Sequence, residues 1–238
     1  MENKKGFAIN IEGVDGSGKH TVSTHLAERI SILGNKICEV VSFPQHGTNQ
    51  GLLVDEFLYR GLRFSGDTIE RANREGMLYA IDRMVTMTAK DKNGRSKLDE
   101  YNEGKLFIFD RYLTSNFLHR CNEMGPQELA EYMELMEIIE YDVIGIPKPD
   151  LVFILKTRPE LALENIEKRG REKDENETLE NIQKSYAKIE ELANKREEYI
   201  TIECCFEDSY GKWSMRDVDS IVMDILTKMR EHKPEILL

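Results

Sequence analysis

The stretch GFAINIEGVDGSGKHT, residues 6–21, decides the fold of this chain. Its first half, residues 6–12, is a short apolar run that predicts a buried strand, and from Gly18 onward apolar residues recur at helical spacing. Three glycines and then Lys19 lie where strand gives way to helix. Because glycines let backbone N–H groups converge and a helix N-terminus attracts anions, the segment predicts a phosphate-binding loop. The alternative is a tight turn that only caps the helix.

His20 follows the lysine, where such loops usually have serine or threonine, and Thr21 comes next. One extra residue turns a helical side chain by about 100°, so two roles stay open for Thr21. Its hydroxyl faces a magnesium ion, or it caps or packs against the helix. We expect the whole loop to bind ATP: Gly13, Val14, Asp15, Gly16, Ser17, Gly18, Lys19, His20 and Thr21.

Four more apolar runs predict strands, at residues 37–43, 106–110, 151–155 and 199–202. Helical spacing predicts helices between and after them, at about 67–88, 126–140, 159–169, 179–193 and 217–229. Strands that alternate with helices imply right-handed crossovers and a mainly parallel sheet, with ligands at the carboxyl ends of its strands. We therefore expect an α/β three-layer sandwich of the P-loop NTPase type, with five strands flanked by helices.

Composition sets the class of protein and its partners. The 238 residues, 40% hydrophobic and 32% charged, indicate one soluble globular domain spanning 1–238. Net charge −11, from 33 basic and 44 acidic residues, would repel nucleic acid and anionic membranes, so we expect neither as a partner. No apolar stretch is long enough to span a bilayer. Four cysteines without metal-ligand spacing indicate reduced thiols and a cytoplasmic location.

Asp110 closes the most continuous of these apolar runs, LFIFD at residues 106–110, and Arg111 follows it. An acid at this edge of a parallel sheet lies beside the phosphates held by the loop, where it can bind Mg²⁺ directly or through water. The alternative is a carboxylate that caps the next helix. The position predicts a second component of a phosphotransferase site.

Several motifs occur in one order along nearly the whole chain. They are EGVDGSGK at 12–19, Phe43-Pro44, Tyr79 with Arg83, Asp110-Arg111-Tyr112 with Ser115, and Pro149-Asp150-Leu151. In this order the motifs resemble the thymidylate kinase family of P-loop nucleoside monophosphate kinases. The resemblance implies transfer of the ATP γ-phosphate to dTMP, giving dTDP and ADP for dTTP synthesis. It also implies Mg²⁺ as cofactor and a homodimer.

The resemblance implies roles for the charged residues. Asp15 accepts the sugar 3′-hydroxyl and lies near Mg²⁺, with Asp110 as the other metal-binding residue. Lys19 bridges the β- and γ-phosphates of ATP, and Arg111 binds the acceptor phosphate. Positioning and charge neutralisation dominate phosphoryl transfer, so these residue types suit the reaction.

The acceptor side follows from the same resemblance. Tyr79 stacks on thymine and Arg83 hydrogen-bonds the base, four residues apart and therefore on one helix face. Ser115 and Asn116 face the base from the other side, and Phe43 and His46 line the site. Taken without the resemblance, Tyr79 is better explained as a core tyrosine. His46, where the family has arginine or tyrosine, either donates to phosphate or is a loop histidine.

The charged segment 168–177 resembles the LID of this family, which closes over ATP. The loop interior, Gly16-Ser17, contains no arginine, so a transition-state cation must come from elsewhere. Arg171 is the predicted catalytic arginine, and Arg169 is its neighbour at the ATP site. The structural alternative is a solvated charged turn between two helices.

Two further functions stay open at this stage. One is a kinase for another nucleoside monophosphate or for a deoxynucleoside, although Arg83 and Arg111 favour an acceptor with both a base and a phosphate. The other is a non-catalytic P-loop protein that binds nucleotide as a switch. No NKxD guanine signature occurs in the sequence.

Overall fold

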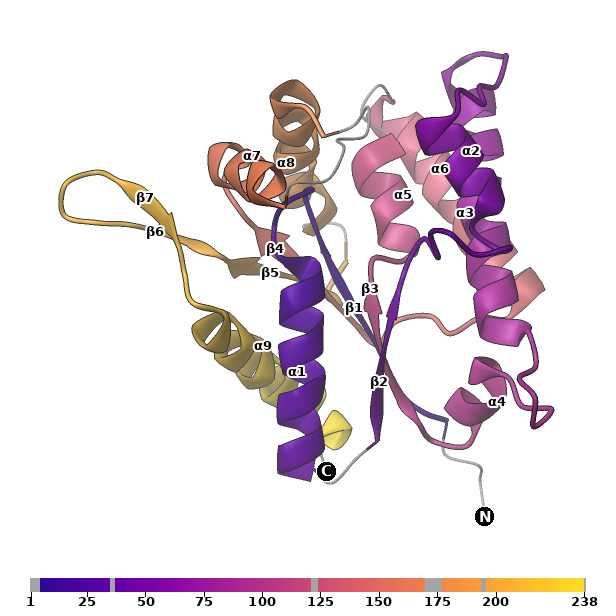
Figure 1. The fold of residues 1–238 in the computed structure, drawn as a ribbon, viewed down its shortest axis with the longest axis horizontal. Helices are drawn as coiled ribbons and strands as arrows, with labels where there is room; N and C mark the ends of the chain where they lie inside the picture. The colour runs from indigo at the N-terminus through magenta and orange to yellow at the C-terminus, as the bar shows by residue number, and fades with distance from the viewer. Residues whose placement is uncertain (1–4, 35–36, 121–123, 170–176, 194–195, 238) are drawn as a thin grey trace.

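The computed structural model describes residues 5–34, 37–120, 124–169, 177–193 and 196–237 (Figure 1). A five-stranded sheet forms its centre, in the order β2-β3-β1-β4-β5, and every neighbouring pair is parallel. The strands are β1 (Ala8–Gly13), β2 (Cys38–Ser42), β3 (Leu106–Asp110), β4 (Leu151–Lys156) and β5 (Tyr199–Glu203). This arrangement confirms the expected α/β sandwich.

Helices cover both faces of the sheet because the central strands are apolar on both sides. Leu106 and Ile108 of β3 point to one face and pack against α1 (Lys19–Gly34) and α9 (Val218–His232). Phe107 and Phe109 point to the other face. That face is covered by α3 (Thr68–Thr88), α5 (Leu113–Arg120), α6 (Pro126–Glu137) and α8 (Leu179–Ala193) (Figure 1). Two apolar layers therefore enclose the sheet.

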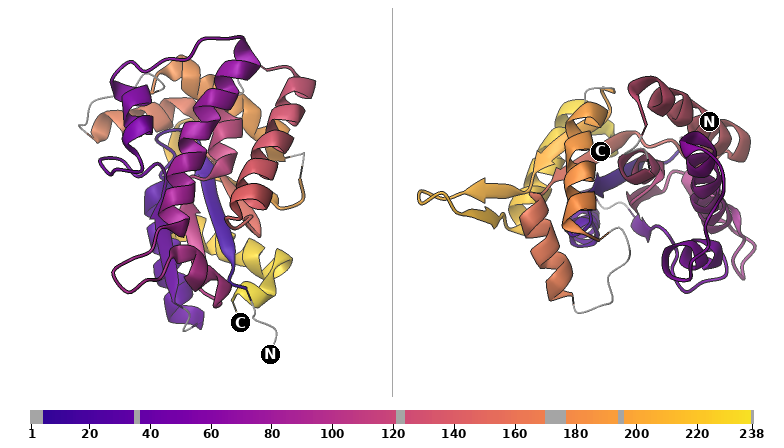
Figure 2. Two further views of the ribbon diagram at one scale, coloured as in Figure 1. Left: turned by 90° about the vertical axis from the view of Figure 1, so that its right-hand side faces the viewer. Right: turned by 90° about the horizontal axis from the view of Figure 1, so that it is seen from above.

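Short helices lie among the long ones, and the periodicity of the sequence did not predict them. They are α2 (Leu52–Tyr59), α4 (Lys97–Asn102) and the eight-residue α5. The helix α7 (Pro159–Lys168), in contrast, corresponds to a predicted helix. The helix predicted at 126–140 ends sooner, at Glu137, and the chain continues as a π-helix, η1 (Ile138–Ile144). A 3-10 turn, η2 (Pro234–Ile236), follows α9. Figure 2 shows α2 beside α3, at one end of the molecule.

A hairpin that the sequence analysis did not predict projects from the sandwich beyond β5 (Figures 1 and 2). It consists of β6 (Cys205–Glu207) and β7 (Trp213–Met215), which pair antiparallel. The Arg158 guanidinium lies 4.2 Å from the centre of the Trp213 ring, at the N-terminus of α7. This contact ties β7 of the hairpin to the main body.

Two sequence expectations concern the whole chain. Cys38, Cys204 and Cys205 are free thiols; Cys121 lies outside the described residues. Burial raises the pKa of Cys38 and of Cys204 to about 12, so these two thiols stay protonated at neutral pH. Across the described part of the chain, no helix is both long enough and apolar enough to cross a bilayer.

Candidate active site

The glycine-rich loop turns sharply from β1 into α1 and is held against α7. Gly16 has φ of 81°, and a Cβ built on it would lie 2.0 Å from the carbonyl oxygen of Ala162. Only glycine tolerates both the positive φ and this close approach. The Asn165 amide donates to the carbonyl of Gly16 at 3.0 Å, which pins the loop from the same side. The loop is therefore a tightly constrained backbone turn.

Lys19, the first residue of α1, is buried inside this turn. Its ammonium donates to the carbonyl oxygens of Gly13 at 2.8 Å and of Val14 at 2.9 Å. Burial and the nearby Arg111 charge lower the pKa of Lys19 to about 8, although three carboxylates oppose the shift. The side chain thus places a cation beside the loop amides, as an anion site requires.

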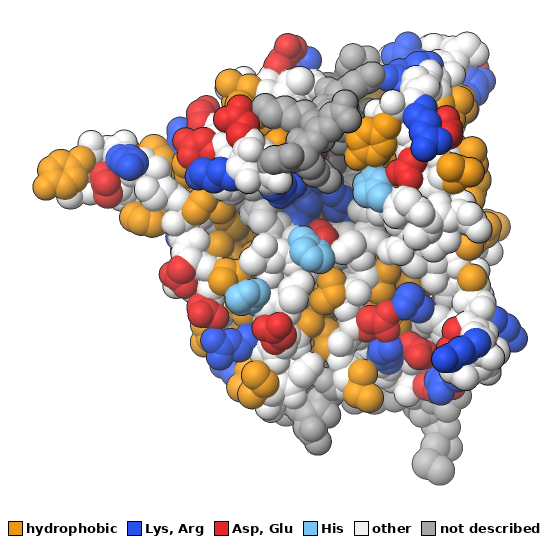
Figure 3. Space-filling model, viewed as in Figure 1, with side chains coloured by type: hydrophobic (Ala, Val, Ile, Leu, Met, Phe, Trp, Pro, Cys, Tyr) orange, Lys and Arg blue, Asp and Glu red, His pale blue; other side chains and the backbone are white. Residues whose placement is uncertain are grey.

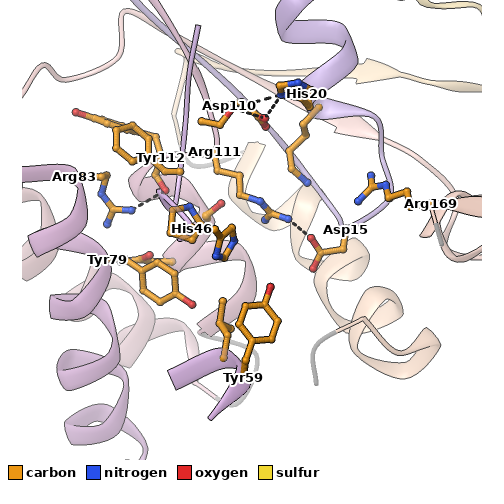
Figure 4. A pocket seen from close by; sticks show the side chains of 18 residues that line it. Asp15, His20, His46, Tyr59, Tyr79, Arg83, Asp110, Arg111, Tyr112 and Arg169 are labelled. Atoms are coloured by element: carbon orange, nitrogen blue, oxygen red, sulfur yellow. Dashed lines mark hydrogen bonds and ion pairs between the residues drawn. The ribbon is translucent and has the colours of Figure 1, made fainter. Parts of the chain in front are cut away.

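Arg111 comes directly after β3 and forms an ion pair with Asp15 of the loop (Figure 4). Its φ is 65°, a left-handed conformation that costs a non-glycine residue about 1–3 kcal/mol and is found mostly at functional sites. Burial disfavours the charge, but the carboxylates of Asp15, Glu12 and Asp110 outweigh that penalty and raise the pKa of Arg111. The guanidinium stays charged beside the loop.

Glu12 is fully buried behind the loop and connects it to α5. Its Oε1 accepts the backbone N–H of Gly13 at 3.0 Å, and its Oε2 accepts the Ser115 hydroxyl at 2.5 Å. Burial raises the pKa of Glu12, while the charges of Lys19 and Arg111 oppose the rise. Ser115 is therefore positioned by a carboxyl group that sequence reasoning assigned no role.

Asp110 ends β3 directly beside the last residue of β2. The Ser42 hydroxyl donates to Asp110 Oδ2 at 3.0 Å, and His20 Nδ1 lies 3.2 Å from the same oxygen (Figure 4). Ser42 and Asp110 are partners in the parallel register of the two strands. The first turn of α1 supplies His20. Three polar side chains therefore meet at the carboxyl edge of the sheet.

Arg83 of α3 is buried and held by a two-fold ion pair. Its Nε and NH2 donate to the Glu140 carboxylate at 2.7 and 2.6 Å, and its guanidinium lies 5.8 Å from the centre of the Tyr112 ring. Burial disfavours its charge, but Glu140 outweighs the penalty and raises the pKa of Arg83. Glu140 belongs to the π-helix η1. Tyr79, one turn earlier on α3, is partly buried on the same side (Figure 4).

The segment after β2 closes this side of the site. The backbone N–H of Gln45 donates to both carboxylate oxygens of Asp82, at 3.1 and 3.3 Å. His46 Nδ1 lies 2.6 Å from the Asp55 carboxylate of α2, and the His46 ring is 5.8 Å from that of Tyr59. Residues 43–46 are therefore fastened to both α3 and α2.

All these elements surround one cavity of about 360 Å³. Most of the residues predicted for the site line it: Asp15, Gly16, Lys19, His20, Phe43, His46, Tyr79, Arg83, Asp110, Arg111, Ser115, Asn116 and Arg169. Figure 3 shows basic side chains gathered in a hollow on this face, with histidine at the rim. An acidic protein thus presents a locally basic cavity that suits anionic ligands.

Comparison with known proteins decides which family this chain belongs to. The family model described as Thymidylate kinase matches residues 11–207, most of the chain. The chain belongs to the thymidylate kinase family. This confirms the resemblance seen in the sequence and the expectation of an enzyme that is a thymidylate kinase.

Individual relatives agree with the family assignment. A thymidylate kinase of Schizosaccharomyces pombe is 23% identical over 230 residues, covering 96% of this chain and 95% of the relative. A thymidylate kinase of Leptospira interrogans is 27% identical, covering 86% and 94%. Among solved structures, a thymidylate kinase of Candida albicans has a TM-score of 0.64 at 20% identity, covering 96% and 93%. The last comparison concerns the fold.

Some residues predicted for the thymidylate kinase site lie elsewhere or are not placed. Gly13, Val14, Ser17, Gly18 and Thr21 belong to the loop or to α1 but not to the described lining of the cavity, and Thr21 is exposed. Arg171 lies outside the described residues, as does most of the predicted LID at 168–177. Arg169 is exposed and lines the cavity from the end of α7. The roles given to all these residues stay predictions.

Several residues of the thymidylate kinase site were not predicted. Ser42, Leu58 and Tyr59 line the cavity, and Glu140 holds Arg83 from outside it. The apolar segment LLVDEFLY at 52–59 was a signal for α2 that the analysis did not use. For Glu140 the sequence offered no such signal, because the residue reaches Arg83 only through tertiary packing.

Asp82 gives this site a pH-dependent contribution to stability. Burial raises its pKa from 3.8 to about 6, so between these values the folded state binds a proton that the unfolded state has lost. Stability therefore falls as pH rises from about 4 to 6. Asp82→Asn removes this dependence and keeps an acceptor for Gln45. We expect the free energy of unfolding of the variant minus that of wild type to increase by up to about 3 kcal/mol between pH 4 and pH 7.5. Urea unfolding at the two pH values measures it.

The control for that experiment is Asp142→Asn, which removes a carboxylate from an exposed position on η1. If the free energy of unfolding of Asp82→Asn differed from that of wild type by the same amount at pH 4 and at pH 7.5, the assignment of the raised pKa to Asp82 would be contradicted.

Proposed function

We propose that this protein transfers the γ-phosphate of ATP to dTMP, giving ADP and dTDP. One observation carries the proposal: the glycine-rich loop with Lys19, and the acceptor-type residues Arg111, Tyr79 and Arg83, line a single cavity. A donor phosphate on the loop would therefore face an acceptor held by the β3–α5 segment and α3. Such positioning is the main requirement of phosphoryl transfer.

On the donor side, the loop amides and Lys19 would hold the ATP phosphates, since the lysine is buried among them with its charge retained at neutral pH. Arg169 lines the same cavity from the end of α7. Arg171 remains the residue that the sequence predicts as the cation of the transition state. Its part is to neutralise charge that develops on the transferred group.

On the acceptor side, Arg111 would bind the phosphate of dTMP, and Asp15 would accept the sugar 3′-hydroxyl. The ion pair between these two residues holds both at the loop. Tyr79 would stack on the base, and the Arg83 guanidinium, fixed by Glu140, would hydrogen-bond it. Ser115 and Asn116 of α5 line the same cavity and would face the base from the other side. Phe43 and His46 would close the site from the β2–α2 segment.

The cofactor we propose is Mg²⁺, bound with ATP. Its carboxylate ligands from the sequence are Asp15 and Asp110, and both line the cavity beside Lys19. Oxygen donors of this kind fit a hard divalent cation that keeps phosphate and water ligands. When bound, the cation would neutralise negative charge on the β- and γ-phosphates.

A coupled assay of ADP release tests the proposed function. The enzyme, ATP and Mg²⁺ are combined with dTMP, dUMP, dCMP, dGMP, AMP or thymidine at equal concentrations. We expect dTMP to be the preferred acceptor. Preference for another acceptor would overturn the substrate assignment and direct attention to His46; no turnover with any acceptor would favour a non-catalytic nucleotide-binding protein. The panel is broad because the Candida albicans relative is described as having broad substrate specificity.

Arg111→Ala tests the role given to the acceptor-side arginine. We expect the KM for dTMP to rise about 10–100-fold and the KM for ATP to change much less, because a charged hydrogen bond of about 1.5–3 kcal/mol to the acceptor is lost. Steady-state kinetics with each substrate varied in turn measure both values. Arg29→Ala, at an exposed ion pair with Asp219, is the control. An unchanged KM for dTMP would contradict the role.

Two predictions from the sequence stay open. The homodimer rests on the family resemblance, and light scattering after size-exclusion chromatography measures it directly. The cytoplasmic location rests on the cysteine pattern of the sequence.

A further inference from the structure

Three side-chain atoms that can act as metal ligands meet beside the phosphate-binding loop. His20 Nδ1 lies 3.2 Å from Asp110 Oδ2, the Ser42 hydroxyl oxygen lies 3.0 Å from that same oxygen, and it lies 3.4 Å from His20 Nδ1. An imidazole nitrogen, a carboxylate oxygen and a hydroxyl oxygen thus form a nearly equilateral triangle. Figure 4 shows His20 and Asp110 turned toward each other at one edge of the site.

The size of this triangle fits one face of an octahedral metal site. Ligand bonds of about 2.0–2.1 Å, the values for Mg²⁺, place neighbouring ligands about 3.0 Å apart. The three measured edges equal this length or exceed it slightly. A cation of Mg²⁺ size or somewhat larger would therefore reach all three atoms with small side-chain adjustments.

The position of the triangle explains why a nucleotide would complete it. Ser42 and Asp110 lie side by side at the carboxyl ends of β2 and β3, and His20 adjoins Lys19 in the first turn of α1. All three line the cavity that Lys19 also lines. The described residues contain no group of three His, Cys, Asp or Glu side chains able to hold a metal. The other half of the coordination sphere must then come from phosphate oxygens and water.

Asp15, the other carboxylate predicted for the metal, is placed differently. It forms an ion pair with Arg111, whereas His20 lies beside Asp110 (Figure 4). Moving Asp15 to a metal would leave the half-buried Arg111 guanidinium without the carboxylate of its ion pair. Asp110, Ser42 and His20 could bind a metal without breaking the ion pair between Asp15 and Arg111.

We propose that His20, Asp110 and Ser42 form the protein face of the divalent-metal site, and that the His20 nitrogen shifts its preference from Mg²⁺ toward first-row transition ions such as Mn²⁺. This inference rests on the proposed function for the presence of a metal–nucleotide complex. Mg²⁺ favours oxygen ligands alone, whereas affinity for nitrogen-containing sites rises from Mn²⁺ along the first-row series. Phosphate-binding loops usually place a hydroxyl after the lysine, so the imidazole is a feature of this chain.

The test detects the nitrogen ligand directly, without turnover. The full-length protein is loaded with Mn²⁺ and ADP, and electron spin echo envelope modulation is recorded with natural and with ¹⁵N-labelled histidine. We expect a nitrogen coupling to Mn²⁺ that changes with the label, which separates histidine from the nitrogens of adenine. The coupling should vanish in His20→Ser and persist in His232→Ser, where the histidine is exposed at the end of α9.

A second measurement gives the selectivity. Mg²⁺ competition against Mn²⁺ in the ADP complex yields the ratio of the two dissociation constants. We expect the dissociation constant for Mg²⁺ divided by that for Mn²⁺ to fall by at least about tenfold in His20→Ser. Loss of even an indirect metal contact commonly costs 10–100-fold in affinity. An unchanged ratio would overturn the proposed preference.

The outcomes separate this inference from the proposed function. Bound Mn²⁺–ADP without a histidine coupling, or a coupling that survives in His20→Ser, overturns the inference and leaves dTMP phosphorylation to the acceptor assay. A histidine coupling in a protein that phosphorylates none of the acceptors upholds the metal site and overturns the function. If the His20 variant does not fold, the absence of a histidine coupling in wild type, or its loss in His46→Gln at another histidine that lines the cavity, overturns the inference.

Discussion

Lys19→Ala is expected to lower kcat by about 10²–10³-fold or more, the loss seen when one preorganised group that stabilises transition-state charge is removed. Lys19 is buried at the start of α1, and its ammonium donates to the carbonyls of Gly13 and Val14. No other lysine lines the cavity among the residues that the structure describes. Steady-state kinetics with ATP and dTMP measure the effect.

Loss of fold must be separated from loss of catalysis in this variant. Lys19→Met keeps most of the aliphatic side chain and removes only the charge, so it should fold even if the alanine variant is unstable. Lys90→Ala, at an exposed position beyond α3, is the matched control. A folded Lys19→Met enzyme with kcat within tenfold of wild type would contradict the role of the lysine.

Glu140→Ala is expected to destabilise the protein by about 3–5 kcal/mol, because removing one partner of a buried ion pair leaves the other charge uncompensated. The Arg83 and Glu140 side chains are 2% and 0% exposed, and two hydrogen bonds join them. Urea unfolding at neutral pH measures the change in free energy of unfolding.

Two comparisons sharpen the Glu140 experiment. Arg83→Met combined with Glu140→Leu removes both charges and should recover much of the lost stability, since a buried pair replaced by apolar residues is often neutral or better. Glu56→Ala breaks the exposed pair with Arg60 on α2 and should cost less than about 1 kcal/mol. A double variant as unstable as Glu140→Ala would contradict the explanation from uncompensated charge.

The same double variant separates stability from recognition. If Arg83 contacts the base of the acceptor, the folded double variant has a raised KM for dTMP and a nearly unchanged KM for ATP. Equal values for wild type and variant would restrict Arg83 to a structural role.

Local signals in the sequence were enough for the sheet and the loop. All five strands of the sheet lie on predicted apolar runs, and the central strands β1 and β3 are buried along their whole length. The turn from β1 to α1 was also readable, since Gly13, Gly16 and Gly18 allow a backbone turn with positive φ within a few residues. The family resemblance added the order of the site residues along the chain.

Other features depend on contacts between distant segments. The hairpin of β6 and β7 is too short to show an alternating pattern, and the π-helix η1 continues the periodicity of α6 without a break in the sequence. The carboxylate partners of His46 and Arg83, namely Asp55 and Glu140, lie 9 and 57 residues away from them. No periodicity within one element identifies such pairs.

The sequence by itself determined the strands, the phosphate-binding loop and the family, because each depends on hydrophobic pattern or backbone freedom within a short segment. Only the tertiary structure decided that Asp15 pairs with Arg111 and that Asp110 meets Ser42 and His20. The physical reason is the parallel register of β1 and β2 with β3 beside α1, which brings side chains 22 to 96 residues apart within hydrogen-bond distance.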